Sequence, residues 1–324
     1  MGKGKLKISG TIQERYNAIS GKQEPKNFKM SRNVILQSSN FERSLFDTDT
    51  MEEKGEMSFT LGRITRQITE RDLYSSIFAL SQIFSNQSYK SGQETGLGKG
   101  TENKALSRIT GVTERNGEIY FSLNEYCKLA NGTDDPSTQE RKAAETLLKT
   151  LDSTPSEIEY KDTKVEAYLA KTVTRVIESD GSIYYHVYLH PLFLNMSKGF
   201  ASVPQDVIKR LRDGVRSQKG RMTDAHYKLL ALLVQQRADG GKVFTRTALE
   251  ILQYLGLEQA YREQKQRTIK QLLQTFEAVR CTGVITGFKA KYIKLNGKDV
   301  FDRVDFYLNP YFTKNDAIEI IESE

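Results

Sequence analysis

The spacing of apolar residues along the chain changes near Thr69. Before this point, residues 1–65 mix Gly, Ser, Asn, Lys and Glu with scattered apolar residues and show no sustained period. We therefore expect a flexible or weakly ordered N-terminal arm. In "TERDLYSSIFALSQIFSNQSY", which starts at Thr69, a threonine cap and acidic residues in the first turn precede four apolar residues at helical spacing: Leu73, Ile77, Leu80 and Phe84. This pattern predicts an amphipathic helix.

The next part of the chain has the pattern of a strand, two short helices and a hairpin. A loop rich in Gly, Ser and Lys, residues 91–104, leads to the short strand "EIYFSL". The segments "SLNEYCKLANG" and "PSTQERKAAETLLKTLDS" predict two helices in tandem, the first closed by Asn131-Gly132. Two β-rich runs follow, "KVEAYLAKTVTRVIE" and "SIYYHVYLH", joined by a turn at Ser179-Asp180-Gly181. This order of elements is typical of a winged helix.

The second half of the chain repeats that order. "TDAHYKLLALLVQQR" predicts a helix and "KVFT" a short strand, and "TRTALEILQYLGL" predicts the next helix. "EQAYREQKQRTIKQLLQTFEAVR" predicts one longer helix, with a buried stripe of Ile269, Leu272, Leu273 and Phe276. Two strands then flank Asn296-Gly297, a strong signal for a two-residue hairpin turn.

Both halves close on nearly the same phrase. "YLHPLF" starts at Tyr188 and "YLNPYF" starts 119 residues later, at Tyr307. Phe121 and Phe244, which precede the paired helices, are 123 residues apart. Proline has no backbone donor and ends a strand, so the phrases mark where each last strand leaves its sheet. Two unrelated strands with similar ends are the alternative, and the matching order of elements favours a duplication.

We therefore predict an α+β fold with two tandem winged-helix domains, each a helix-turn-helix with a β-hairpin wing. The predicted boundaries are residues 66–200 for the first domain and residues 201–324 for the second, after the arm of residues 1–65.

The longer helix of the second domain carries polar side chains suited to reading DNA. If Ile269 points inward, three side chains point nearly opposite to it, Gln264, Arg267 and Gln271, flanked by Glu263, Thr268 and Lys270. Arginine and glutamine can each form two hydrogen bonds to a base edge, and lysine and threonine can bind phosphate. The hairpin adds four lysines for contact with the DNA backbone or minor groove, Lys289, Lys291, Lys294 and Lys298. The alternative is an ordinary solvent-exposed helix face.

The equivalent helix of the first domain has nearly balanced charges. It exposes Gln139, Lys142, Glu145, Thr146 and Lys149 on our helical projection. We expect weaker DNA contact from Gln139, Lys142 and Lys149, combined with protein contact through the hairpin from Val165 to Leu189.

Charge points to a polyanionic partner. Residues 201–300 hold 19 Lys and Arg against 9 Asp and Glu, a net charge of +10 in a chain of net charge +7. Such a basic segment favours nucleic acid as partner, although a merely solvated basic surface is the alternative. The mean hydropathy is −0.55 and no apolar run is long enough to span a membrane. We expect a soluble, cytoplasmic protein with no membrane partner.

Residues for catalysis or metal binding are weakly represented. On a strand, His186 and His190 would lie about 13 Å apart, too far to share a metal ion. "GLGKGT", which begins at Gly96, lacks the spacing of a phosphate-binding loop, and the two cysteines, Cys127 and Cys281, are expected to be buried. We therefore expect no enzyme activity, no cofactor and no metal. A nickase that uses a tyrosine, a nucleotide hydrolase and a pure interaction scaffold are the remaining alternatives.

The chain resembles the replication initiators of iteron-bearing plasmids. The resemblance is carried by the tandem winged-helix pattern, the aromatic-proline phrase, "KGFASVPQDVIKRL" and "DAHYKLLALL". The resemblance covers roughly residues 69–312. Lys198-Gly199-Phe200 fits a basic-Gly-Phe turn of that family, whereas His226-Tyr227-Lys228-Leu229 departs from its Arg-Leu-Tyr helix.

The resemblance implies a non-enzymatic protein that binds direct repeats at a plasmid origin and bends or melts the adjacent A·T-rich DNA. It implies recruitment of host replication proteins such as the helicase, and a homodimer through the first domain that represses the protein's own promoter. It also assigns recognition to Gln264, Arg267, Thr268, Lys270 and Gln271, and phosphate contact to the wing lysines. A winged-helix transcriptional repressor without an initiator role is the alternative.

Overall fold

The computed structural model gives the arrangement of most of the chain from residue 67 onward and of a few short segments before it. It describes residues 12, 16–17, 25–31, 58–60, 67–91, 117–160, 163–190, 193, 200–238, 240–295 and 297–309. "GLGKGT" and both prolines of the closing phrases lie outside the described residues.

The first winged-helix unit begins with helix α3 (Glu70–Ser91), as the apolar spacing predicts. Thr69 caps it by accepting a hydrogen bond from the backbone N–H of Asp72 (3.1 Å). Leu73, Ile77 and Leu80 are completely or almost completely buried. The unit continues with β3 (Glu118–Ser122), α5 (Leu123–Asn131), α6 (Thr138–Ser153), β6 (Ala170–Ile177) and β7 (Ile183–Leu189), and its antiparallel strands take the order β3-β7-β6.

A second hairpin is inserted between α6 and β6. It consists of β4 (Pro155–Tyr160) and β5 (Thr163–Tyr168), and β2 (Ser58–Thr60) pairs with β4. The sequence predicts one strand here, whereas the structure has two, β5 and β6, which are separated by a bend at Leu169. The bend has no glycine or proline, so the sequence does not reveal it.

The second unit repeats this layout. It contains α9 (Asp224–Ala238), β9 (Val243–Thr247), α10 (Ala248–Tyr254), α11 (Glu258–Glu263), α12 (Lys265–Arg280), β10 (Ile285–Leu295) and β11 (Lys298–Leu308). Its strands take the order β9-β11-β10, the same as β3-β7-β6 in the first unit. Leu295 pairs with Lys298 across the predicted two-residue turn, in which Gly297 has a φ of +75°. The single long helix predicted here is instead two helices, divided at Gln264.

The two units share details as well as topology. Phe121 pairs with Tyr185 and Phe244 pairs with Phe306, and in both pairs the rings stack, with centroids 5.5 and 6.3 Å apart. The last strand of each sheet ends within its closing phrase, at Leu189 and at Leu308. The chain is therefore an α+β protein with two tandem winged-helix units, as predicted.

The N-terminal segment differs in part from the expected arm. Strand β1 (Asn27–Ser31) pairs with β8 (Phe200–Pro204), and Phe28 and Met30 are completely buried. The backbone N–H of Lys29 also donates to Ser85 Oγ on α3 (2.8 Å). Strand β1 therefore adds Phe28 and Met30 to the core, and most of residues 1–65 lie outside the described residues.

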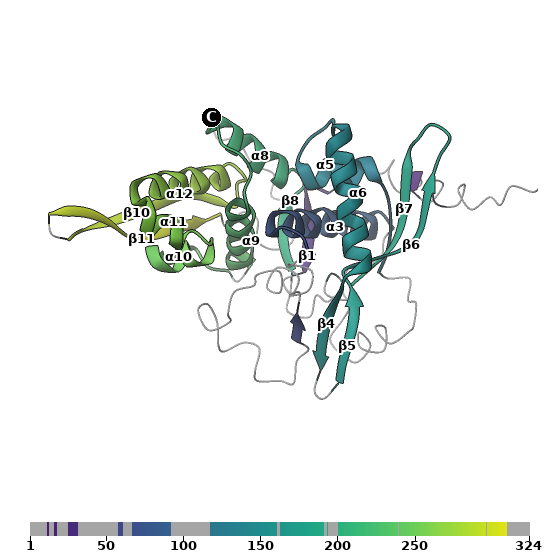
Figure 1. The fold of residues 1–324 in the computed structure, drawn as a ribbon, viewed down its shortest axis with the longest axis horizontal. Coiled ribbons are helices and arrows are strands. Elements are labelled where there is room, and N and C mark those ends of the chain that lie inside the picture. The colour runs from purple at the N-terminus through teal and green to yellow at the C-terminus, as the bar shows by residue number, and fades with distance from the viewer. Residues whose placement is uncertain are drawn as a thin grey trace, which may run out of the picture.

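Helix α8 (Val207–Ser217) connects the two units (Figure 1). At one end, Gly132 closes α5 with a φ of +61°, and a Cβ there would lie 2.7 Å from the backbone of Ile208. At the other end, a Cβ on Gly214 would lie 2.8 Å from the carbonyl oxygen of Ala278 on α12. Such close backbone contacts at both ends fix α8 against both units.

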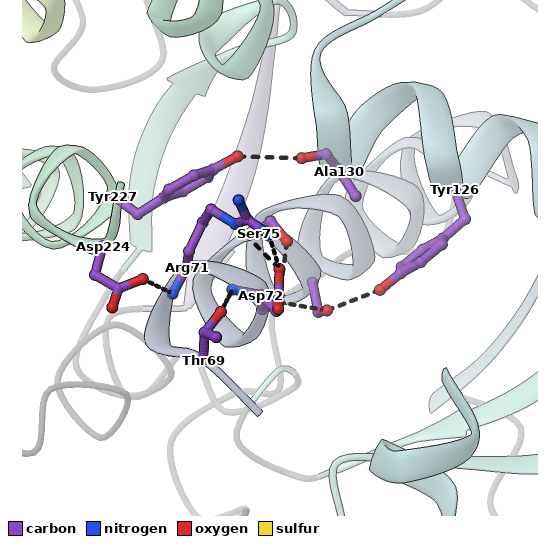
Figure 2. A network of polar contacts seen from close by, with 9 residues as sticks. Thr69, Arg71, Asp72, Ser75, Tyr126, Ala130, Asp224 and Tyr227 are labelled. Atoms are coloured by element: carbon purple, nitrogen blue, oxygen red, sulfur yellow. Dashed lines mark hydrogen bonds and ion pairs between the residues drawn. The ribbon is translucent and has the colours of Figure 1, made fainter. Parts of the chain in front are cut away.

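Helices α3 and α9 also join the units, through the network in Figure 2. The backbone N–H of Arg71 donates to Asp224 Oδ1 (2.9 Å), and the Tyr227 hydroxyl donates to the carbonyl oxygen of Ala130 (3.3 Å). Lys228 Nζ lies 2.5 Å from Glu70 Oε2. Figure 1 shows α8 between the two units and α9 on the side of the second unit that faces α3, with the β10–β11 wing extending from one end. No helix in the described part of the chain is both long and apolar enough to cross a bilayer.

Candidate nucleic-acid interface

Helix α12 presents a polar edge to solvent. It begins after Gln264, whose backbone (φ −138°, ψ 61°) interrupts the helix. Leu272 and Phe276 anchor the inner face and are fully buried, whereas Arg267, Lys270 and Gln271 are exposed. The exposure predicted for these three residues is confirmed.

Thr268 does not belong to this edge. It is 2% exposed, and its hydroxyl donates to the carbonyl oxygen of Gln264 (3.1 Å), so its predicted outward position is wrong. The helical projection took Ile269 as the centre of the inner face, but Ile269 is only half-buried and the inner face is centred on Leu272. Gln264 is exposed at the joint between α11 and α12, where its Oε1 accepts a hydrogen bond from Arg267 Nη1 (3.1 Å).

The sequence prediction also missed Gln266, which is exposed on α12. A projection centred on Leu272 would have found it, since Gln266 then lies on the same outer side as Lys270.

A groove of about 460 Å³ lies beside the polar edge of α12. Its α12 side is formed by Arg267, Lys270, Gln271, Gln274 and Thr275, and its other side by Val215, Gln218, Gly220, Arg221, Thr223 and His226. Burial lowers the pKa of His226 to about 4, and its Nδ1 accepts a hydrogen bond from the backbone N–H of Thr223 (3.2 Å). The imidazole is therefore neutral at pH 7, and the positive charge of the groove comes from Arg267, Lys270 and Arg221.

The wing lysines differ in their surroundings. Lys289, Lys294 and Lys298 are exposed, as expected for side chains that meet phosphate. Lys291 instead lies 2.6 Å from Asp305 Oδ2, and this lysine, followed by a hydrogen bond from Thr245, lowers the pKa of the Asp305 carboxyl. Lys291 thus joins the two strands of the wing, a role that the sequence does not reveal.

The outer part of the wing also exposes apolar side chains. Tyr292, Ile293 and Leu295 are 46%, 43% and 52% exposed. The sequence prediction did not select them, although their position next to Asn296-Gly297 is a signal for a projecting tip.

Helix α6, the counterpart of α12, exposes Gln139, Lys142 and Lys149 as predicted. Lys149 Nζ lies 3.6 Å from Glu145 Oε1, and the same carboxylate lies 2.5 Å from Arg175 Nη2 on β6. Part of the positive charge of α6 is therefore balanced within the unit.

A second groove, of about 730 Å³, runs between α6, α3 and α8. Four arginines line it: Arg71, Arg212, Arg216 and Arg221. Arg221, Val215 and Gly220 also line the groove beside α12. Arg212 pairs with Glu140 Oε1 (3.3 Å), and Arg71 with Asp72 Oδ1 (3.0 Å; Figure 2). Arg216 and Arg221 are exposed.

The histidines, cysteines and tyrosines add structural detail. The described residues contain no cluster of His, Cys, Asp and Glu suited to a metal ion. Burial lowers the pKa of His190 to about 3, and Tyr185 is 3% exposed with a pKa raised by burial. Cys127 is buried as predicted, but the same prediction for Cys281 is wrong, because it is exposed just after α12 ends.

Comparisons with known proteins add little to this geometry. No protein-family model matches the chain, and no curated protein matches it. A crystal structure of domains 2 and 3 of RctB, as selenomethionine derivatives, is similar to this chain with a TM-score of 0.41 and 12% sequence identity, over 80% of this chain and 93% of that one. A likeness at this level supports no conclusion about function.

Proposed function

We propose that the protein binds double-stranded DNA sequence-specifically, without catalysis, and initiates plasmid replication by binding repeats at the origin. The observation that carries this proposal is the polar edge of α12, where Arg267, Lys270 and Gln271 are exposed beside a basic groove. This edge lies in the segment of the chain with a net charge of +10.

The side chains of this edge match the chemistry of a major groove. An arginine can donate two hydrogen bonds to guanine O6 and N7, and a glutamine can bond adenine N6 and N7. Lys270 lies one turn from Arg267 and can bind a phosphate at the groove margin. The exposed wing lysines, Lys289, Lys294 and Lys298, supply further backbone contacts.

The repeated unit supports a second, weaker contact with DNA. Helix α6 occupies in the first unit the place of α12 in the second, and it exposes Gln139, Lys142 and Lys149. Because Glu145 offsets some of its charge, we assign α6 a smaller share of the affinity.

Duplex binding tests the assignment of α12. Fluorescence anisotropy with origin DNA should show that Arg267→Ala costs about 1 to 3 kcal/mol of binding free energy and relaxes specificity at one base pair. Arg280→Ala is the matched control, since Arg280 is exposed on the last turn of α12 and pairs with Glu277. An affinity within twofold of wild type for both Arg267→Ala and Lys270→Ala at moderate salt would contradict the assignment.

The initiator role is tested by a footprint on the DNA that encodes the protein. Several protected direct repeats beside an A·T-rich tract support an initiator. One protected inverted repeat over a promoter supports the repressor alternative. Loading of host helicase onto origin DNA in the presence of the protein tests the proposed recruitment.

Absence of catalysis is tested with supercoiled origin DNA, Mg²⁺ and ATP. We expect neither nicked circles nor released phosphate. Either product, if lost on substitution of a single tyrosine or lysine, would overturn the non-enzymatic assignment.

A homodimeric, promoter-bound form is the second candidate, and one observation favours it. Among the described strands, β6 pairs only with β7 and so leaves one edge open. Val173 and Ile177 on this strand are 45% and 59% exposed. An open edge with exposed apolar residues is suited to pairing with a second copy.

A further inference from the structure

The turn between α8 and α9 lies between the two grooves. Val215, Gly220 and Arg221 line both grooves, whereas Arg216 lines only the groove beside α6 and Gln218 only the groove beside α12. The turn therefore borders both the groove beside α6 and the groove beside α12.

Lys219, in this turn, has an unusual backbone conformation. Its φ is +54°, and it is the only residue other than glycine with a positive φ in the described part of the chain. The hydrogen bonds around it, from Lys219 N to Arg216 O (2.8 Å) and from Gly220 N to Val215 O (3.0 Å), form the motif that ends many helices with a left-handed residue. Glycine normally takes this position, because a Cβ is strained there.

A strained residue is evidence that its side chain has a use. Lysine occupies a position where glycine would have less backbone strain, and backbone strain of this kind concentrates at functional sites. Lys219 is exposed, as are Arg216 and Arg221 on either side of it. From Gly214 to Thr223 the chain carries three cations and no acidic residue.

The turn is also held in a fixed position. At one end of α8, the backbone of Ile208 lies against Gly132, and at the other end Gly214 lies against the backbone of Ala278. The C-terminal end of α8 therefore cannot shift without breaking a contact between backbones. The three cations therefore have a constant position relative to both α6 and α12, which suits them to a rigid array of phosphates.

We propose that Arg216, Lys219 and Arg221 form a phosphate clamp that grips the DNA backbone between the segments contacted by α6 and α12. This inference rests on the proposed function and adds a binding site to it. The clamp contributes affinity for any duplex and no base preference, because phosphates carry no sequence information.

Replacing Lys219 separates DNA binding from stability. Lys219→Gly should raise the melting temperature by relieving the backbone strain, and still weaken duplex binding. Loss of one phosphate contact lowers the slope of log affinity against log salt by about 0.9, so the affinity loss should be roughly threefold larger at 50 mM than at 200 mM salt. Lys219→Ala should show the same loss of duplex affinity without the gain in stability. Lys219→Arg, which keeps the positive charge, should bind duplex as the wild type does.

Lys242→Ala is the matched control. Lys242 is exposed in the same basic segment but follows the C-terminal end of α9, about 20 Å along that helix from the turn. We expect it to leave the salt slope unchanged. Origin and unrelated duplexes should lose affinity equally in Lys219→Gly, whereas Arg267→Ala should affect mainly the origin sequence.

The outcomes distinguish the clamp from the proposed function. A wild-type salt slope in Lys219→Gly, together with weakened binding in Arg267→Ala, overturns the clamp and leaves DNA binding by α12 in place. A wild-type protein that binds no duplex overturns both.

Discussion

Gly214 on α8 lies so close to Ala278 on α12 that a Cβ at Gly214 would be 2.8 Å from the Ala278 carbonyl oxygen and 3.0 Å from its Cα. Backbone atoms cannot move aside as a flexible side chain can. The contact therefore fixes the distance between the helix that connects the two winged-helix units and the helix that we assign to base recognition.

Gly214→Ala is expected to destabilise the protein. The added methyl must push α8 away from α12, and overpacking of this kind costs about 1 to 3 kcal/mol. Urea unfolding measures the change. Gly287→Ala is the control, since a Cβ at Gly287 meets nothing within 4 Å and its φ is not in the left-handed region. Equal stability of the two variants would show that α8 is not held by this contact.

Local sequence signals predicted the repeated fold because each was contained within a few residues. The Asn-Gly pair at residues 296–297 predicted the two-residue turn between Leu295 and Lys298, and the helical spacing from Leu73 to Phe84 predicted α3. In contrast, β1 depends on pairing between Asn27 and Pro204, and such a distant partner leaves no local pattern.

The candidate site was predicted less accurately than the fold, for two physical reasons. First, the projection of α12 was centred on Ile269, which is partly exposed, so it placed the buried Thr268 outside and omitted Gln266. Second, a lysine gives no indication that its φ will be positive, so the conformation of Lys219 could not be predicted. Only the glycine that follows it indicates the end of a helix.

The wing lysines are expected to separate into structural and DNA-binding residues. Lys291→Ala removes the charged partner of the buried Asp305, so it should lower the urea midpoint and leave the salt dependence of duplex binding unchanged. Lys294→Ala should leave the urea midpoint unchanged and reduce the salt slope by about 0.9. The same salt slope in both variants would contradict this division.

Stability should fall as the pH is lowered from 6.5 toward 4. Burial lowers the pKa of His226 to about 4 and that of His190 to about 3, whereas an unfolded histidine titrates near pH 6.5. Between these values the unfolded chain binds more protons than the folded one, so each histidine reduces the unfolding free energy by up to about 1.4 kcal/mol per pH unit. The contribution is complete above pH 6.5.

His226→Asn tests this pH dependence, because an asparagine oxygen can accept the hydrogen bond from the Thr223 N–H in place of Nδ1. Urea unfolding at pH 7, 6 and 5 should show a shallower decline for the variant than for wild type. A parallel decline in both proteins would show that His226 is not buried in its neutral form.

Association of two copies through β6 should be sensitive to charge on its open edge. Val173→Lys places an ammonium group on an exposed position of β6, where lysine opposes strand pairing without disturbing the core. Val243→Lys is the matched control, since Val243 is 50% exposed and β9 is an outer strand of the second unit's sheet. Sedimentation velocity at tens of micromolar protein should show a dimer for wild type and Val243→Lys and a monomer for Val173→Lys.

The Val173→Lys protein should also bind a single direct repeat with wild-type affinity and lose affinity for an inverted repeat, because only the inverted repeat requires two joined copies. A dimer that persists in Val173→Lys would mean that the copies meet elsewhere.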